Sequence, residues 1–263
     1  MSTALKTLIG HTGALSDCAW SFDSKSLATA SDDCDVFLWE METGRCLLIL
    51  SGHSAPVLSC QYSPTDALVA SASCDETVRL WDTSTGSCIS ILPAHADPVT
   101  AIHFSKDGTI LISTSHDGIC RVWDVHTGCC LKSVDLRVAL DFVVFVPMSQ
   151  LVCTVASNGE LFLWDLALET CMAHLDRKRK TYFVGQQPCF VKRASSFLVI
   201  MPESDSLRIW DMKLGTRKLN SENIEMEQHR ESTLLAYNES SERLFMCSSC
   251  KLDVSVWVVP YAG

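Results

Sequence analysis

The sequence predicts an all-β protein built from repeated copies of one four-stranded unit. Six tryptophans recur along the 263 residues at spacings of 42, 42, 41, 46 and 47 residues: Trp39, Trp81, Trp123, Trp164, Trp210 and Trp257. A histidine stands 28 residues before four of them, at His11, His53, His95 and His229. Repeats of this length are typical of propeller blades, whose sheets must stack to bury their faces.

Short segments within each unit predict the individual strands. VTAIHFS (99–105) and TILISTS (109–115) alternate roughly between apolar and polar residues, and the turn residues KDG lie between them. A charged turn then precedes an apolar strand that ends at the tryptophan, as in SASCDETVRLWDTSTG at residues 71–86. No segment has a convincing helical period, so the prediction is all-β throughout.

The phrases GH and WD at this spacing resemble the WD40 repeat, and the resemblance covers essentially the whole chain. In that family a histidine, a serine or threonine, a turn aspartate and the tryptophan hold each blade together. A buried indole N–H needs an acceptor, and the hydroxyl can join it to the histidine and aspartate. The resemblance implies three complete sets: His11, Thr29, Asp33 and Trp39; His53, Ser71, Asp75 and Trp81; His95, Ser113, Asp117 and Trp123.

The later units depart from this pattern. The fourth keeps Thr154 and Trp164 but has Leu136 at the histidine position and Asn158 at the aspartate position. The fifth unit has Ile200 at the hydroxyl position and Ser204 at the aspartate position. The sixth has Cys247 and Lys251 at the same two positions. We therefore expect the first three units to be better specified than the rest.

The two ends of the sequence predict how the array closes. ALKTLIGH (4–11) aligns with CLLILSGH (46–53), an outer fourth strand followed by the next histidine. LDVSVWVV (252–259) contains a third strand that no fourth follows. Pairing the two would leave no exposed sheet edge. The prediction is a single WD40 β-propeller domain over residues 1–263 with six blades, closed by the N-terminal strand; the alternative is an incomplete or open seven-bladed propeller.

Composition excludes several function classes. The net charge of −10 argues against nonspecific binding to nucleic acid and suits a basic partner. No apolar run approaches the roughly 18 residues of a membrane span, and the N-terminus has no secretory signal pattern. The motifs HExxH, GxSxG and GxGxxG and the phosphate loop are absent, so we expect no enzyme, metal or cofactor.

The fourteen cysteines include a recurring group that we expect to behave as small buried apolar side chains. Without a secretory signal, a reducing compartment is the default and disulfides are not expected. The recurring group is Cys46, Cys88, Cys129 and Cys171.

Two rings of residues are predicted to form the rim of one channel mouth. Five residues after each histidine position, the inner strands carry Ser16, Leu58, Thr100 and Asp141. The residues before the turn aspartate positions are Asp32, Cys74, His116 and Ser157. We expect Asp32 and Asp141 to make the mouth acidic and suited to a Lys/Arg peptide; the alternative is that both are ordinary solvated surface acids.

A closer resemblance, strongest over residues 9–133, is to WD-repeat subunits of histone lysine methyltransferase complexes. It implies a nuclear scaffold whose rim grips an arginine of a histone tail or methyltransferase peptide between aromatic rings. Leu58, Cys74 and His116 replace aromatic residues there, while Phe142 and Phe183 remain. The alternative is a general scaffold or substrate adaptor that has lost this pocket.

The cluster RKRK (177–180) is a nuclear-import patch, a contact for an acidic partner or an exposed loop, so a cytoplasmic location stays open.

Overall fold

The computed structural model describes residues 7–146, 151–166 and 170–175, and beyond them the strands at 189–192, 196–202, 206–213, 219–225, 233–238, 243–248 and 254–258. These residues form strands, turns and bends and contain no helix, which confirms the all-β prediction for this part of the chain. No helix in these ranges is long and apolar enough to cross a membrane.

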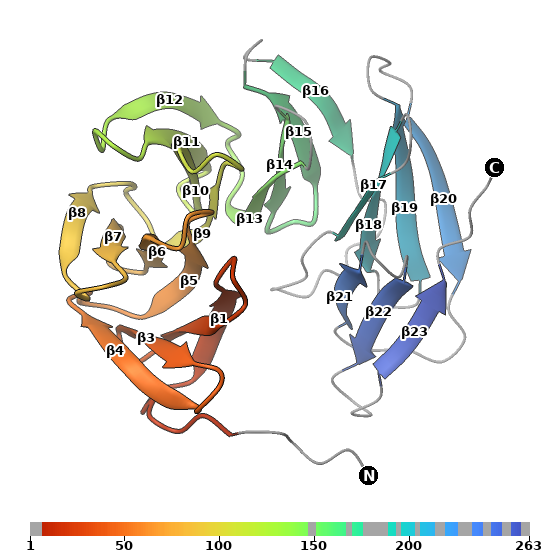
Figure 1. Ribbon diagram of the computed structural model, residues 1–263. Coiled ribbons are helices and arrows are strands. Elements are labelled where there is room, and N and C mark those ends of the chain that lie inside the picture. Colours follow the sequence, from red (N-terminus) through yellow and green to blue (C-terminus); the bar gives the residue numbers. More distant parts are fainter. Residues whose placement is uncertain are drawn as a thin grey trace. The chain divides into compact units, whose positions relative to one another are not determined.

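Three four-stranded antiparallel sheets follow one another along the first part of the chain (Figure 1). The first sheet contains β1 (Leu15–Trp20), β2 (Ser26–Ser31), β3 (Asp35–Glu40) and β4 (Arg45–Ser51). The second contains β5 (Val57–Tyr62), β6 (Leu68–Ser73), β7 (Val78–Asp82) and β8 (Cys88–Leu92). The third contains β9 (Val99–Phe104), β10 (Ile110–Ser115), β11 (Ile119–Asp124) and β12 (Cys130–Asp135).

Three further sheets occupy the rest of the described chain. The fourth contains β13 (Leu140–Phe145), β14 (Leu151–Ala156), β15 (Leu161–Asp165) and β16 (Thr170–Leu175). The fifth contains β17 (Cys189–Lys192), β18 (Ser196–Pro202), β19 (Ser206–Lys213) and β20 (Leu219–Glu225). The sixth has three strands, β21 (Thr233–Asn238), β22 (Arg243–Ser248) and β23 (Val254–Val258).

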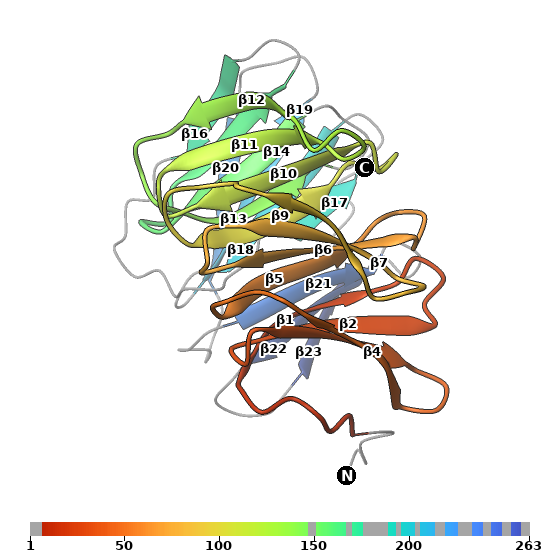
Figure 2. The ribbon, with the colours of Figure 1, turned by 90° about the vertical axis from the view of Figure 1, so that its left-hand side faces the viewer.

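The chain divides into two compact units. The first comprises Met1–Phe145 and Cys153–Ala156, and the second comprises Val146–Val152 and Ser157–Gly263. In the first unit, β1, β5, β9 and β13 lie side by side on the inner side, and β4, β8 and β12 form the outer edges (Figure 1). Figure 2, turned by 90°, shows β12, β11, β10 and β9 in this order across the third sheet. The single domain predicted over 1–263 stays a prediction.

Alternating apolar residues bury each sheet of the first unit against the next. β5 contacts β1 and β2, and β9 contacts β5 and β6, so each inner strand packs on the preceding sheet. Val57 of β5 and Val99 of β9 are fully buried in these contacts. The core of the first unit therefore lies between consecutive sheets, as the stacking of repeated sheets requires.

The N-terminal strand expected over residues 4–11 is not present in its described part. Residues 7–11 form no strand, residues 1–6 lie outside the described residues, and Ile9 is 86% exposed. A strand is stable only when it pairs with a neighbour, and the described residues give this segment no pairing. The expectation that the last sheet has only three strands agrees with β21–β23.

The recurring cysteines are exposed, so the expectation that they are buried is wrong. Cys46, Cys88, Cys129 and Cys171 are all at the surface. Three of them lie on outer strands, whose outward faces no further sheet covers. The residue of the third sheet equivalent to Cys46 is Cys130, because each of these two cysteines pairs with the tryptophan of its sheet.

Buried hydrogen bonds also connect consecutive sheets of the first unit. The Asp17 carboxylate on β1 accepts hydrogen bonds from the Ser59 hydroxyl (2.9 Å) and the Cys60 N–H (3.1 Å) on β5. The Phe104 N–H on β9 donates to Gln61 Oε1 on β5, at 2.6 Å. Burial raises the pKa of Asp17, against the lowering effect of these hydrogen bonds.

We predict that Asp17→Ala lowers the free energy of unfolding by about 1–3 kcal/mol, because it leaves the Ser59 hydroxyl and the Cys60 N–H without their acceptor. Urea denaturation followed by circular dichroism measures the effect. Lys25→Ala is the control, since the Lys25 side chain is exposed and its change should stay within about 0.5 kcal/mol. Equal stability of the two variants would contradict the bridging role of Asp17.

Candidate functional site

The second sheet contains the predicted four-residue network in full. Trp81 Nε1 donates to Ser71 Oγ at 2.8 Å, and His53 Nε2 lies 2.7 Å from the same oxygen. His53 Nδ1 lies 2.8 Å from the Asp75 carboxylate. Asp75 also accepts from the Ser54 N–H and the Thr77 N–H, which ties the core to the turns on either side. The four residues of the second predicted set therefore contact one another in one network.

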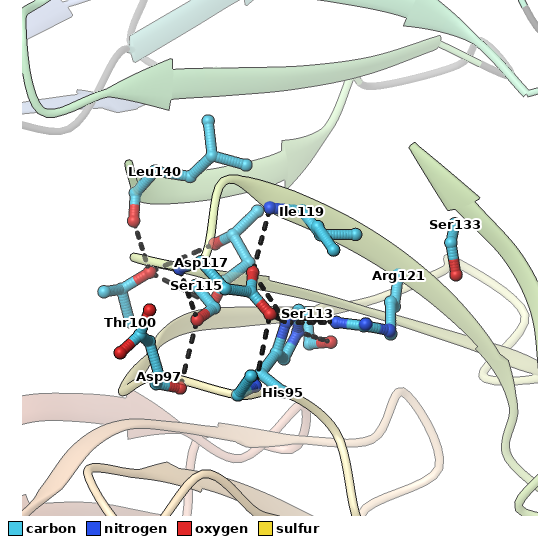
Figure 3. A network of polar contacts seen from close by, with 12 residues as sticks. His95, Asp97, Thr100, Ser113, Ser115, Asp117, Ile119, Arg121, Ser133 and Leu140 are labelled. Atoms are coloured by element: carbon cyan, nitrogen blue, oxygen red, sulfur yellow. Dashed lines mark hydrogen bonds and ion pairs between the residues drawn. The ribbon is translucent and has the colours of Figure 1, made fainter. Parts of the chain in front are cut away.

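The first and third sheets repeat the arrangement. In the first sheet, Thr29 Oγ1 is 2.8 Å from both Trp39 Nε1 and His11 Nε2, and His11 Nδ1 is 2.8 Å from Asp33. In the third sheet, Trp123 Nε1 donates to Ser113 Oγ at 2.9 Å. Figure 3 shows how His95 lies between the Ser113 hydroxyl and the Asp117 carboxylate, at 2.8 Å and 3.0 Å. The residues of the first and third predicted sets therefore make the same contacts as those of the second.

The residue two positions before the tryptophan lies against the network and differs between sheets. In the first sheet Phe37 packs on His11, with ring centroids 4.0 Å apart. In the third sheet Arg121 Nη1 lies 3.2 Å from the Asp117 carboxylate (Figure 3). In the second sheet the Arg79 guanidinium lies 5.9 Å from the centre of the Trp81 ring. This position therefore changes the electrostatics of the network without breaking it.

The networks lower the pKa values of their three aspartates, and burial lowers the pKa values of His53 and His95. Burial would raise the pKa of Asp33, but hydrogen bonds from the Thr12 N–H and the His11 ring lower it to about 2. Burial would also raise the pKa of Asp75, but hydrogen bonds from the Thr77 and His53 side chains lower it to about 2. Burial lowers the pKa of His53, more than the neighbouring Asp75 raises it.

One recurring element of the network was missed from the sequence. Ser31, Ser73 and Ser115 are fully buried, two residues before each turn aspartate. Their hydroxyls accept the N–H of Asp33, Asp75 and Asp117 at 3.2, 3.0 and 3.0 Å. The signal was present, because a serine recurs there in all three units. These hydroxyls fix the turn that presents the aspartate to the histidine.

The fourth sheet lacks this network, as the departures in its sequence led us to expect. Thr154 Oγ1 and Trp164 Nε1 are buried, and neither has a hydrogen-bond partner among the described residues. In place of a tetrad, Phe162 stacks on His174 of the outer strand, with ring centroids 4.5 Å apart and nearly parallel planes. His174 Nε2 also lies 3.4 Å from a Glu160 carboxylate oxygen.

The predicted rim residues of the first unit share one end of their sheets. Ser16, Leu58, Thr100, Asp141 and Phe142 lie near the starts of the inner strands β1, β5, β9 and β13. The second set, Asp32, Cys74 and His116, directly follows β2, β6 and β10. Because β1 and β2 are antiparallel, the end of the second strand lies beside the start of the first. We call these eight residues the rim.

Contacts within the rim link three pairs of its residues. The Ser16 hydroxyl donates to the exposed Asp32 carboxylate at 3.3 Å. His116 Nε2 lies 3.2 Å from the buried Asp141 carboxylate of the next sheet. Burial raises the pKa of the Cys74 thiol, and the charge of nearby Asp32 raises it further. Asp32 is therefore the accessible carboxylate of the rim, and Asp141 is already engaged by an imidazole.

The other rim residues contribute packing and shape. The Thr100 hydroxyl donates to the Leu140 carbonyl oxygen at 2.7 Å, across the third and fourth sheets (Figure 3). Leu58 and Phe142 are half-buried. Phe183 and the basic cluster at 177–180 lie outside the described residues. No group of three or more histidine, cysteine or acidic residues suited to a metal ion occurs in the described part of the chain.

Comparison with known proteins identifies the repeats. Residues 2–40, 44–82 and 86–124 match the model described as "WD domain, G-beta repeat". Three segments of the chain therefore match WD40 repeats, and each segment ends in the third strand of one of the first three sheets. No curated protein matches the sequence.

A solved structure supports the fold over nearly the whole chain. A chain of the "Crystal Structure of Mitotic Checkpoint Complex" is 18% identical, with a TM-score of 0.79 over 95% of this chain and 76% of that chain. At this identity the similarity shows the fold and carries no function.

We predict that stability changes little between about pH 8 and pH 7 and falls as the pH drops through 6.5, the ordinary histidine pKa. The folded pKa values of His53 and His95 are lowered by burial, so the unfolded chain binds more protons below that pH. A second fall is expected below the ordinary aspartate pKa of 3.8, because Asp33 and Asp75 titrate only near 2 when folded. Urea midpoints between pH 8 and pH 3 measure both; a midpoint that rises from pH 7 to pH 5 contradicts the assignment.

Proposed function

We propose that the protein is a non-enzymatic interaction scaffold whose rim binds a basic segment of a partner protein. WD40 repeats are a widespread protein-interaction scaffold, and the three found here carry the rim residues on β1, β5 and β9. The observation that carries the proposal is the exposed Asp32 carboxylate, held by the Ser16 hydroxyl at the ends of the sheets.

The tetrad aspartates support this assignment by contrast. The Asp33 carboxylate is hydrogen-bonded to His11 and to the Thr12 N–H, so it has a structural role in the first sheet. Asp32 precedes it in the same turn, and the long bond from Ser16 is the only hydrogen bond that its side chain makes within the described residues. An exposed carboxylate beside a hydroxyl is an acceptor pair for a guanidinium or ammonium group.

The proposed ligand binds with modest affinity. Leu58, Cys74 and His116 provide little of the aromatic surface that strengthens cation binding by about 0.5–2 kcal/mol per ring. The guanidinium would therefore depend on charge-assisted hydrogen bonds more than on stacking. The half-buried Phe142 is the remaining aromatic residue of the rim.

We predict that Asp32→Asn weakens binding of a short peptide with one central arginine about tenfold to a hundredfold, because it removes a charge-assisted hydrogen bond of roughly 1.5–3 kcal/mol. Isothermal titration at low salt measures the affinity, and the same peptide with citrulline tests the need for charge. Asp23→Asn is the matched control, since Asp23 lies in the turn at the opposite end of the first sheet. Unchanged affinity in Asp32→Asn, or an equal loss of affinity in Asp23→Asn, would contradict the proposal.

Membership of a nuclear histone methyltransferase complex stays a prediction from the resemblance. The alternative, a general scaffold or adaptor without an arginine pocket, differs in one measurable property: it binds its partner without using Asp32. Affinity purification of the wild type and of Asp32→Asn separates the two, because only a partner bound through the rim is lost from the variant.

We further propose that the six sheets close into a six-bladed propeller, with the C-terminal sheet covering β1. The support comes from equivalent positions in the first unit. Leu15 is 62% exposed, whereas Val57, Val99 and Leu140 are fully buried. Trp20 is 55% exposed, whereas Tyr62 and Phe104 are 7% and 3% exposed. The preceding sheet covers the inner strands β5, β9 and β13 of the second, third and fourth sheets.

The frame of the repeats supports residues 4–9 as the missing outer strand. The second and third matches begin just before β4 and β8 and end in the third strand of the next sheet. The first match begins at residue 2, so residues 4–9 correspond in the repeat to an outer strand, and we propose that closure makes them one; the first sheet already has β4 as its outer strand. Among the described residues, β21–β23 is the sheet that has three strands and no fourth.

We predict that Cys18 of β1 is protected from N-ethylmaleimide in the native full-length chain to the same degree as buried Cys60, its equivalent on β5. Deleting residues 1–9 should remove that protection and lower the melting temperature, because the closing strand is lost. Mass spectrometry of the modified peptides measures both sites, with rates normalised to the urea-unfolded chain. Rapid native labelling of Cys18, or an unchanged melting curve after the deletion, contradicts closure.

A further inference from the structure

One arginine of the first unit has no anionic partner among the described residues. Arg79 lies on β7 and is half-buried, and its Nε is buried without a hydrogen-bond partner. The part of the chain that the structure describes gives its guanidinium no hydrogen bond or ion pair. The group lies 5.9 Å from the centre of the Trp81 ring, and a Cβ added to Gly52 would come within 2.7 Å of its Nη1. Its N–H donors are therefore left for solvent or for a ligand.

The turn aspartate of the second sheet cannot serve as the partner of this arginine. A carboxylate offers about four acceptor positions, and the Asp75 carboxylate accepts four hydrogen bonds already. They come from the His53 ring, the Ser54 N–H, and the N–H and hydroxyl of Thr77.

The third sheet shows what the absence of one hydroxyl changes. Ile119 stands at the position of Thr77 and brings no hydroxyl to the turn aspartate. Arg121, the equivalent of Arg79, donates there to the Asp117 carboxylate at 3.2 Å (Figure 3). The threonine hydroxyl of the second sheet therefore accounts for the unpaired arginine.

The surface beside Arg79 is apolar and belongs to a free sheet edge. Strand β8 is the outermost strand of its sheet and pairs only with β7 among the described strands. Ile91 lies directly opposite Arg79 across these two strands, so both side chains are on one face. Ile89 and Ile91 are 57% and 53% exposed. Charged residues often protect such edges, as Arg45 on β4 and Lys132 on β12 can, but β8 has none.

We propose that Arg79 and the edge of β8 bind an extended segment of a partner protein that carries an acidic side chain next to apolar ones. The guanidinium donates to the carboxylate, and the backbone of the segment pairs with the free edge of β8. The apolar side chains of the segment cover Ile89 and Ile91.

The charge of the protein favours a carboxylate over a phosphate at this site. One guanidinium balances one negative charge, and a chain with a net charge of −10 repels the second charge of a phosphate. The acidic rim suits a basic segment, so the two sites select segments of opposite charge.

A short capped peptide with one glutamate between valines tests the site in the full-length chain. Isothermal titration at low salt should show binding that Arg79→Gln weakens at least about tenfold, because a charge-assisted hydrogen bond is lost. Arg121→Gln is the matched control and should leave the affinity unchanged, because Arg121 is paired with Asp117. No measurable binding to the unmodified chain, or an equal loss in both variants, overturns the proposal.

Variants of the peptide test the chemistry of the ligand. Glutamine in place of the glutamate should weaken binding at least about tenfold, and serines in place of the valines should also weaken it. Phosphoserine in place of the glutamate should bind more weakly than the glutamate peptide. Equal affinity for the glutamine peptide, or tighter binding of the phosphoserine peptide, overturns the assignment of a carboxylate.

A substitution beside the site tests why Arg79 is unpaired. Thr77→Ile gives the second sheet the residue that the third has, and it frees one acceptor position of Asp75. Arg79 should then pair with Asp75, so the glutamate peptide should bind severalfold more weakly although Arg79 itself is unchanged. Unchanged affinity in Thr77→Ile contradicts the proposed origin of the site.

Discussion

A hydrogen bond from a buried indole to a hydroxyl is the interaction on which each of the first three sheets depends. Trp81 is almost completely buried, and its N–H has no water to bind, so Ser71 must accept it. The same hydroxyl contacts His53, and His53 contacts Asp75. Asp75 in turn accepts backbone N–H groups of the flanking loops. One requirement of the core therefore determines the conformation of the surface turns.

This dependence separates structural charge from charge that is free to bind a ligand. Asp33 lies at the end of its network and is ionised by its hydrogen bonds, so removing it would disturb the fold. The residue before the turn aspartate has no comparable structural role. In three successive sheets it is Asp32, Cys74 and His116. Side chains that share no structural role can differ from sheet to sheet. Specificity for a partner is therefore expected at the rim, within turns that the tetrads hold rigid.

Sequence reasoning predicted the features that repeat and missed those that depend on neighbouring sheets. The three tetrads and the all-β architecture followed from spacing, because the same local chemistry recurs every 42 residues. The contact of Asp17 with Ser59 was not predictable, because it joins two neighbouring sheets. The repeat pattern describes each sheet and does not say which side chains of two sheets meet. The exposure of Cys46 was misjudged because its neighbours Leu47 to Ile49 are apolar, which suggested a buried strand. In the structure they lie on an outer strand, and Leu47 and Ile49 are exposed with Cys46.

The fourth sheet shows what the loss of one network member does to the rest. Leu136 in place of histidine is visible in the sequence, but its consequence is not, because Thr154 and Trp164 could still have bonded to each other. In the structure neither is partnered, so the hydroxyl–indole contact itself depends on the histidine that orients the hydroxyl in the other sheets. A tetrad is thus cooperative: its aspartate and histidine position the acceptor for the tryptophan, and without them the buried polar atoms become a cost to folding.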